Sequence, residues 1–385
     1  MFSARSFFRM CLICFCALFA VGVSAQDVRL FVPETIYAVP GVEMNVYFNN
    51  IVTVINPKNL VFDVTCSKGR NDAKRWRFTP DKKDAGTYKW SVRVIGADGV
   101  VASAESKLVV LPFDAGSKKE ISMLMVGASQ TGAGVYPDRM VELMKRPGNP
   151  KFTTVGTKGR AGKHEGYGGW RWISFLDRWG YTNSKEMDGM HPDRPVGFNS
   201  PFLFPDKEGK GKFDLQKYFD KNNNGKIPDV VSFQLGLNDF FNQTDDTIAD
   251  ITKKSIASME KLIAEFRKLK PAPEIMIFQH IPGANQDAFG NNYRCGQTSW
   301  QYRKNLDHYN RALLKKGKEL NLTVVPVYIN IDTENNFPVL LQPVNEGNNA
   351  KVSRQNNGVH PARAGYCQMG DTLYCYLKAL LHNKK

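Results

Sequence analysis

Hydrophobic and polar residues alternate in short segments over the first third of the chain, between residues 27 and 112. Gly, Pro, Asn and Asp separate these segments. A period of two is typical of strands with one buried face, and turns at this spacing are typical of antiparallel sandwiches. We therefore expect a small all-β sandwich domain over residues 26–113, with strands at residues 36–38, 44–48, 60–65, 75–79, 88–95 and 106–111.

The segment from Asp84 to Tyr88 leads into a strand that carries Trp90, Val92 and Val94 on one face. This arrangement resembles the tyrosine corner of immunoglobulin-like domains, in which a Tyr hydroxyl ties down the chain that enters a strand. The resemblance concerns architecture, because a fold of this kind does not by itself imply binding. The domain is interpreted as a spacer or packing module, with a glycan-binding role as the alternative.

Solid apolar runs replace the alternation after residue 120, and amphipathic segments separate them. Such runs predict strands buried on both faces, which occur in parallel sheets covered by helices. We expect five parallel strands, at residues 121–126, 152–155, 230–235, 275–280 and 322–329. We expect helices at residues 136–145, 170–179, 247–268, 299–319 and 362–381. Residues 121–385 are thus predicted to form a doubly wound α/β domain, and residues 114–120 a linker.

The first 25 residues have the pattern of a secretory signal peptide. Arg5 and Arg9 precede an apolar run of 13 residues from Met10 to Gly22, and small residues lead up to a cleavage site after Ala25. The run is too short to span a bilayer, which takes roughly 20 residues. We therefore expect the protein to be secreted or periplasmic, with no transmembrane segment.

Composition narrows the classes of function only slightly. With 42% hydrophobic and 23% charged residues, the chain is neither collagen-like nor a multi-span membrane protein. The formal net charge of +15 is spread along the chain and no nucleic-acid-binding motif accompanies it, so we expect no nucleic-acid partner. Acidic glycans or an anionic surface stay open as partners, as does the oligomeric state.

Candidate chemistry follows the predicted strands, because sites in doubly wound sheets form beyond the carboxyl ends of the strands. After the first strand, Ser129 stands in Gly127-Ala128-Ser129-Gln130-Thr131-Gly132 on a tight turn into a helix. The segment lacks the phosphate-loop and dinucleotide-binding glycine patterns, and it lacks the G-x-S-x-G elbow of α/β-hydrolases.

Three further blocks follow in order. His164-Glu165-Gly166-Tyr167-Gly168-Gly169-Trp170 comes after the second strand, Gly236-Leu237-Asn238-Asp239 after the third, and Gly358-Val359-His360-Pro361 before the last helix. Together with the Ser129 block, this set resembles the SGNH (GDSL-type) hydrolase family over residues 121–385. The resemblance implies a flavodoxin-like three-layer αβα fold with a five-stranded parallel sheet.

The resemblance also implies roles for individual residues. Ser129 would be the nucleophile and His360 the general base and acid of an acyl transfer. The oxyanion hole would consist of the backbone N–H groups of Ser129 and Gly169 and the side-chain amide of Asn238. Asp239 is interpreted as a structural residue at the strand end.

Two positions depart from the family pattern. Ala128 stands where Asp is usual, and Asn357 stands three residues before His360, where the acid of the triad is expected. Three interpretations follow from the missing acid. His360 could be oriented by the Asn357 amide or a backbone carbonyl, it could use another acid (Asp332, Glu334 or Glu346), or activity could be weak or lost.

Three more residues are candidates for contact with substrate: His164, Trp170 and His280. No cluster of His, Cys and carboxylate residues has the spacing of a zinc site, and we expect neither a metal nor a cofactor. The turn at residues 220–225 resembles the opening of a calcium loop, but Val231 occupies the position of the bidentate Glu.

The expected function is that of a secreted serine esterase. The signal peptide, the attached sandwich and the family resemblance together favour short-chain (acetyl) esters, in particular O-acetyl groups on carbohydrate. The alternatives are a lipase, lysophospholipase or thioesterase of the same family, or a catalytically impaired glycan-binding protein.

Overall fold

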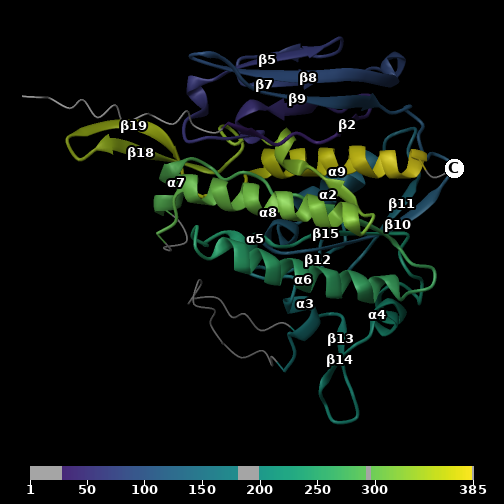
Figure 1. Ribbon diagram of the computed structural model, residues 1–385. Coiled ribbons are helices and arrows are strands. Elements are labelled where there is room, and N and C mark those ends of the chain that lie inside the picture. The colour runs from purple at the N-terminus through teal and green to yellow at the C-terminus, as the bar shows by residue number, and fades with distance from the viewer. Residues whose placement is uncertain (1–27, 181–198, 292–295, 384–385) are drawn as a thin grey trace, which may run out of the picture.

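A β-rich region sits on top of an α/β domain in this computed structural model, which describes residues 28–180, 199–291 and 296–383 (Figure 1). The predicted signal peptide, residues 1–25, lies outside the described residues.

The β-rich region contains a four-stranded sheet of order β2-β9-β8-β5 and a three-stranded sheet of order β3-β7-β6, and β1 pairs with β4. The strands are β1 (Arg29–Leu30), β2 (Thr35–Ala38), β3 (Met44–Tyr47), β4 (Val52–Thr53), β5 (Val61–Cys66), β6 (Arg70–Asn71), β7 (Arg75–Phe78), β8 (Gly86–Gly96) and β9 (Gly99–Val110). Trp76 of β7 and Trp90 of β8 meet edge to face with ring centroids 6.3 Å apart, and both are buried. They join the two larger sheets.

One expectation for this region is corrected. Strand β2 runs parallel to β9, so the strands are not all antiparallel. Strands β3 to β8 lie between β2 and β9 in the chain, so β2 can join the sheet edge in the direction of β9. The Tyr88 hydroxyl donates to the Asp84 carbonyl oxygen at 2.9 Å, as in a tyrosine corner. The immunoglobulin-like assignment itself stays a prediction.

The α/β domain is built on a parallel sheet of order β11-β10-β15-β16-β17, which confirms the five predicted strands and the flavodoxin-like order. A sixth, very short strand, β12, pairs with the end of β10. The strands are β10 (Glu120–Gly127), β11 (Lys151–Val155), β12 (Glu165–Gly166), β15 (Val230–Gln234), β16 (Glu274–Phe278) and β17 (Thr323–Val325). The fifth strand is shorter than expected because Pro326, which has no N–H, follows it and the chain continues as the 3-10 helix η4 (Val327–Asn330).

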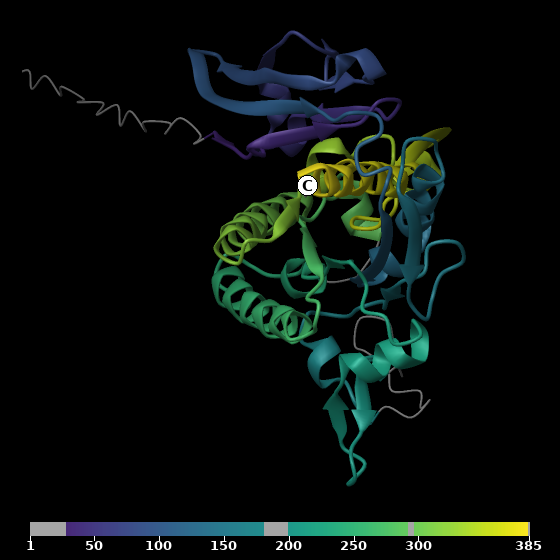
Figure 2. The ribbon, with the colours of Figure 1, turned by 90° about the vertical axis from the view of Figure 1, so that its right-hand side faces the viewer.

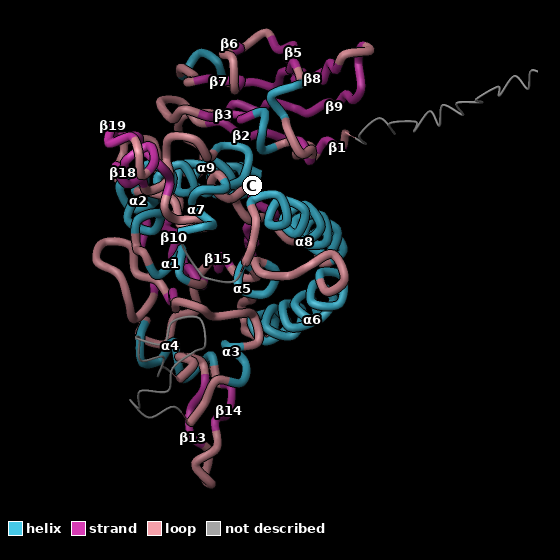
Figure 3. Tube along the Cα trace, turned by 90° about the vertical axis from the view of Figure 1, so that its left-hand side faces the viewer, coloured by secondary structure: helices cyan, strands magenta, loops and turns pink. Residues whose placement is uncertain are grey.

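Helices cover both faces of this sheet, and alternate residues of β10 show it directly. Met123 and Met125 pack in the core shared with α2 and α9, whereas Leu124 and Val126 pack in the core shared with α6 and α8. Figures 2 and 3 show α6 and α8 on one side of the sheet and α2 on the other. The helices are α1 (Ser129–Gly132), α2 (Val135–Met144), α3 (Ser174–Asp177), α4 (Leu215–Asn222), α5 (Leu237–Phe240), α6 (Ile248–Arg267), α7 (Gln286–Asn291), α8 (Ser299–Glu319) and α9 (Arg363–Asn383).

The helix expected at residues 170–179 is reduced to the single turn α3. Two antiparallel hairpins outside the main sheet also lack a counterpart in the predictions, namely β13 (Leu203–Pro205) with β14 (Gly211–Phe213) and β18 (Val339–Asn345) with β19 (Asn348–Gln355). The second hairpin ends two residues before Asn357, so it leads directly into the segment that carries His360.

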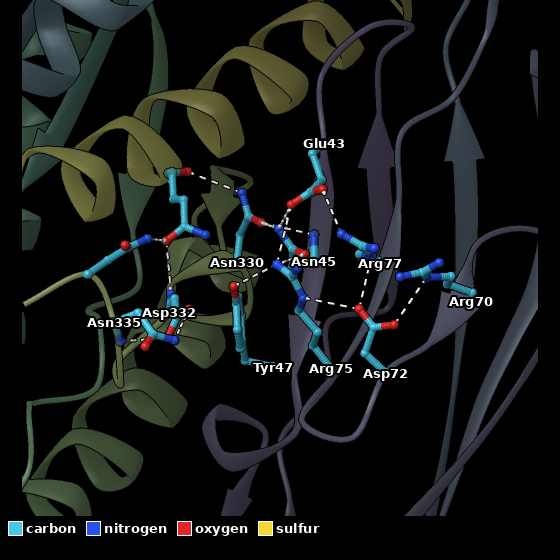
Figure 4. Close-up of polar contacts among 12 residues, drawn as sticks. Glu43, Asn45, Tyr47, Arg70, Asp72, Arg75, Arg77, Asn330, Asp332 and Asn335 are labelled. Atoms are coloured by element: carbon cyan, nitrogen blue, oxygen red, sulfur yellow. Dashed lines mark hydrogen bonds and ion pairs between the residues drawn. The ribbon is translucent and has the colours of Figure 1, made fainter.

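The β-rich region and the α/β domain share one core rather than being joined by a free tether. Polar contacts between η4 and β3 are drawn in Figure 4, where Asn330 meets Asn45. The segment expected to be a linker packs on α9, since a Cβ atom at Gly116 would lie 3.0 Å from Leu381 Cβ. The buried Lys378 ammonium donates to the Phe113 carbonyl oxygen at 3.2 Å.

Candidate active site

Ser129 begins α1, immediately beyond the carboxyl end of β10. The backbone N–H of Ala128 donates to the Gln234 carbonyl oxygen at 3.2 Å, which ties this turn to the end of the neighbouring strand β15. Gly127 is required at the turn, because a Cβ atom there would lie 1.9 Å from Thr131 Oγ1. The local sequence thus places a partly exposed serine at the sheet edge where sites form.

His360 approaches Ser129 from the segment before α9, 231 residues further along the chain. Its Nε2 atom lies 2.6 Å from Ser129 Oγ, within hydrogen-bond distance. The Asn357 side-chain oxygen accepts from the backbone N–H groups of Val359 at 3.1 Å and His360 at 2.8 Å. Asn357 therefore shapes the turn that presents the imidazole.

Asp332 lies elsewhere. Its carboxylate accepts from the backbone N–H groups of Glu334 and Asn335 and from the Asn335 side chain. These bonds close its own turn beside the β-rich region (Figure 4), and no described contact joins it to His360. Glu334 forms an ion pair with Lys74 instead. Asp332 thus caps its own turn, and its role as the acid that orients His360 stays a prediction.

Asn238 stands on α5, beyond the end of β15, and its side-chain Nδ2 donates to the Trp170 carbonyl oxygen at 2.9 Å. The contact joins the third block to the second at the residue that follows Gly169. A carboxamide has two N–H donors, so the second N–H of Asn238 can still serve a substrate oxygen. Gly169 has a φ of +77°, a backbone conformation that favours glycine.

Glu165 organises the second block, a role that sequence reasoning did not assign. The carboxylate is fully buried and accepts from the Thr157 N–H and hydroxyl and from the hydroxyls of Tyr167 and Tyr218, at 2.7 to 2.9 Å. These bonds connect the segment that carries Gly169 to α4. The sequence signal that could have indicated this role is a carboxylate inside the second block, between His164 and Gly166, with Tyr167 close by.

Three residues predicted as candidates for contact with substrate are buried in the structure. His164 is 2% exposed and its Nδ1 accepts from the Gly166 N–H, while Trp170 is 1% exposed and stacks on Tyr167 with ring centroids 4.1 Å apart. His280 is 1% exposed and its Nε2 lies 2.9 Å from the Leu235 carbonyl oxygen. All three residues sit near the right strand ends, but their side chains turn into the core.

Burial also changes the ionisation of several of these groups. It lowers the pKa of His164 and of His280 to about 4, so both imidazoles are neutral near pH 7. Burial raises the pKa of Asp239 to about 7, and its Oδ2 atom has no hydrogen-bond partner among the described residues. Asp239 lies in the core beside Tyr309, which agrees with its interpretation as a structural residue.

Metal binding and membrane insertion are the remaining points. Within residues 28–180, 199–291 and 296–383, no group of three His, Cys, Asp or Glu side chains could hold a metal ion. In the same part of the chain, no helix is long and apolar enough to cross a membrane.

The α/β part is similar to known proteins. Residues 207–373 match the family model described as GDSL-like Lipase/Acylhydrolase, a stretch that contains Asn238 and His360 and begins after Ser129. No curated protein matches the sequence. Solved structures that are similar include a possible lipase from Chitinophaga pinensis DSM 2588, at 16% identity and a TM-score of 0.39, covering 68% of this chain and 100% of that one. A carbohydrate acetylesterase family member from Sinorhizobium meliloti is similar at 14% identity and a TM-score of 0.41, covering 68% and 99%. Residues 207–373 thus match the GDSL-like lipase/acylhydrolase family model, and they lie in the α/β part that follows the all-β N-terminal region.

Proposed function

We propose that the protein is a serine esterase in which Ser129 is the nucleophile and His360 the general base. The 2.6 Å contact between Ser129 Oγ and His360 Nε2 carries the proposal, because a serine becomes an effective nucleophile when an adjacent base can take its proton. The family match supports a hydrolase.

The reaction follows from the positions of these groups. His360 Nε2 takes the hydroxyl proton as Ser129 Oγ attacks the ester carbonyl, and the carbonyl oxygen becomes negative. The backbone N–H groups of Ser129 and Gly169 and the free N–H of Asn238 stabilise that oxygen. His360 then gives its proton to the leaving alcohol, which leaves an acyl group on Ser129 Oγ. In the second half, water attacks the acyl carbon as His360 takes its proton, and His360 returns that proton to Ser129 Oγ as the carboxylic acid leaves.

The carboxylate usual in a triad is replaced by Asn357. We infer that this residue acts by fixing the turn, since its oxygen binds the Val359 and His360 N–H groups. An amide cannot stabilise the imidazolium as a carboxylate does, so the enzyme is expected to be slower than a complete triad.

We further propose a short acyl group, in particular acetyl on carbohydrate, as the substrate of an exported enzyme. The attached all-β region and the family resemblance favour this substrate. The signal pattern of residues 1–25 supports export.

The test is hydrolysis of p-nitrophenyl acetate, butyrate and octanoate by the mature protein. Ser129→Ala and His360→Ala should each lower kcat by about 10³-fold or more. Ser258→Ala on α6 and the exposed His308→Ala are the matched controls and should keep the wild-type rate.

The outcomes separate the candidate functions. Activity that depends on Ser129 and falls with chain length supports the acetylesterase and leads to assays on acetylated xylan and other acetylated glycans. A rate that rises toward octanoate would indicate a lipase or thioesterase. Equal rates for the wild type and Ser129→Ala would overturn the esterase and favour a glycan-binding protein.

A further inference from the structure

A chain of buried side chains lies directly beneath the Ser129 and His360 contact. Gln130, the residue after Ser129, donates through Nε2 to the carbonyl oxygen of Val359, the residue before His360, at 2.8 Å. Its Oε1 accepts from Gln234 Nε2 at 2.7 Å, and the same nitrogen lies 3.4 Å from His280 Nδ1. All three side chains are 1% exposed.

The positions of the hydrogen atoms along these hydrogen bonds can be assigned by starting from His280. The Leu235 carbonyl oxygen can only accept, so His280 Nε2 carries the hydrogen of their 2.9 Å contact. Burial keeps His280 neutral, so Nδ1 has no hydrogen and accepts from Gln234. Gln234 Nε2 therefore gives its two hydrogens to His280 and Gln130, and the Gln130 oxygen must face Gln234. The Gln130 N–H group is left to face Val359.

The arrangement is maintained although it leaves one buried atom without a partner. Gln234 Oε1 has no hydrogen-bond partner among the described residues. A buried acceptor without a donor destabilises a fold. The unpartnered Gln234 oxygen therefore agrees with hydrogen-bonded side chains whose orientation serves a purpose other than stability alone.

We propose that Gln130 is a positioning residue, whose amide holds the Val359–His360 segment at the correct distance from Ser129. Gln130 is bonded covalently to Ser129 and Val359 is bonded covalently to His360. The Gln130–Val359 hydrogen bond therefore runs beside the Ser129–His360 contact as a second link between the same two segments. Gln234 and His280 set which way the Gln130 amide faces.

The inference rests on the proposed function for its kinetic part. Gln130→Met keeps the size of the side chain but removes both hydrogen bonds. It should lower kcat on p-nitrophenyl acetate by about 10- to 100-fold, because small displacements of reacting groups have effects of this size. KM should change less than about threefold, since Gln130 is buried away from the substrate.

Gln279→Met is the matched control. Gln279 is 2% exposed and donates to the Asn310 carbonyl oxygen at 3.1 Å, on the side of α8. This variant loses a buried amide of the same size, so it should lower the melting temperature to a similar extent while keeping the wild-type kcat. An equal loss of kcat in Gln279→Met and Gln130→Met would overturn the positioning role.

A second measurement does not need activity. In protein labelled with ¹⁵N-histidine, Ser129→Ala should shift the His360 Nε2 resonance because it removes the Ser129 hydrogen bond. When Ser129→Ala is added to Gln130→Met, the His360 Nε2 resonance should shift far less. When it is added to Gln279→Met, the resonance should shift as much as in the otherwise wild-type protein. A full shift in Gln130→Met would refute the proposal, even if the protein proves not to be an esterase. If the wild type hydrolyses no ester but the shift is lost in Gln130→Met, the proposed function fails and the positioning role stands.

Discussion

The carboxamide oxygen of Asn330 accepts two hydrogen bonds from Asn45, one from its backbone N–H and one from its side-chain Nδ2, both at 2.9 Å. The two residues are 285 positions apart and both are buried. Asn330 Nδ2 in turn lies 3.1 Å from the Thr372 hydroxyl oxygen. One amide therefore joins β3 of the β-rich region to η4 and α9 of the α/β domain (Figure 4).

Loss of this amide should destabilise both parts of the molecule together. Asn330→Ala removes both bonds and leaves the buried backbone N–H of Asn45 without its described partner, while Asn45 Nδ2 keeps its bond to Glu43. We therefore expect a loss of about 2 kcal/mol in the free energy of unfolding. Urea unfolding followed by far-ultraviolet circular dichroism measures it, with the exposed Asn242→Ala as the control. Two separate transitions in the wild type would show that the shared core does not couple the parts.

Asp239 should make stability depend on pH. Its folded pKa of about 7 lies above its ordinary value of 3.8, so its stabilising contribution is complete below pH 3.8 and is lost as the pH rises toward 7. Asp239→Asn removes this dependence. The free energy of unfolding of the variant relative to the wild type should therefore increase from pH 4 to pH 7, by up to about 4 kcal/mol at 1.36 kcal/mol per pKa unit.

Urea titrations at pH 4, 5.5 and 7 test this prediction, and the exposed Asp246→Asn controls for the loss of one carboxylate. His164 and His280 act in the opposite direction in both proteins, since their pKa values are depressed, and the comparison of variants cancels them. A difference that stays constant over this range would contradict the raised pKa of Asp239.

Gly236 should tolerate no side chain. Its φ is +121°, and a Cβ atom there would lie 2.2 Å from the Tyr309 hydroxyl oxygen, which also bonds Ser255 and Trp172. Gly236→Ala should therefore cost about 3 kcal/mol of stability and also lower esterase activity, because Asn238 follows on the same turn.

Gly209→Ala is the control for the backbone strain alone. Gly209 has a φ of +80°, but nothing lies within 4 Å of its added Cβ atom. We expect it to cost about 1 kcal/mol and to leave activity unchanged. Equal effects of the two substitutions in thermal unfolding would show that the contact with Tyr309 is not the cause.

Glu165 should be needed as a carboxylate. All four described partners donate to it, so Glu165→Gln places an N–H group where an acceptor is needed and removes charge-assisted bonds. We expect a loss of about 2 kcal/mol in the free energy of unfolding. The exposed Glu208→Gln should change it by less than about 0.5 kcal/mol, and a comparable loss there would argue against this role.

Local patterns in the chain were enough to predict the five parallel strands, the long helices and the order of the four blocks. The helix predicted at residues 299–319 coincides with α8, because its apolar residues recur along one face. The shortened strand β17 and the single turn α3 were missed, since Pro326 and tertiary packing override the apolar pattern there.

The positions of the motifs in the sequence also predict Ser129 and His360 as nucleophile and base. Which side chains face the site could not be obtained in that way. His164, Trp170 and His280 follow the correct strands, yet they point into the core, and the direction of a side chain after a strand depends on what packs against it. The acid of the triad is likewise not given by motif position: Asp332, a candidate from the loop after the fifth strand, accepts hydrogen bonds within its own turn.

The chain's periodicity and motif order thus determined the two-part architecture and the candidate nucleophile and base, because these depend on neighbours in sequence. The tertiary structure alone decided that Gln130 reaches Val359, that Glu165 joins the second block to α4, and that Asn330 joins β3 to α9. Each of these contacts spans many residues and depends on hydrogen-bond partners that are brought together only when the sheet and its helices pack. A buried amide or carboxylate has no sequence pattern of its own, since its role is set by the donors and acceptors around it.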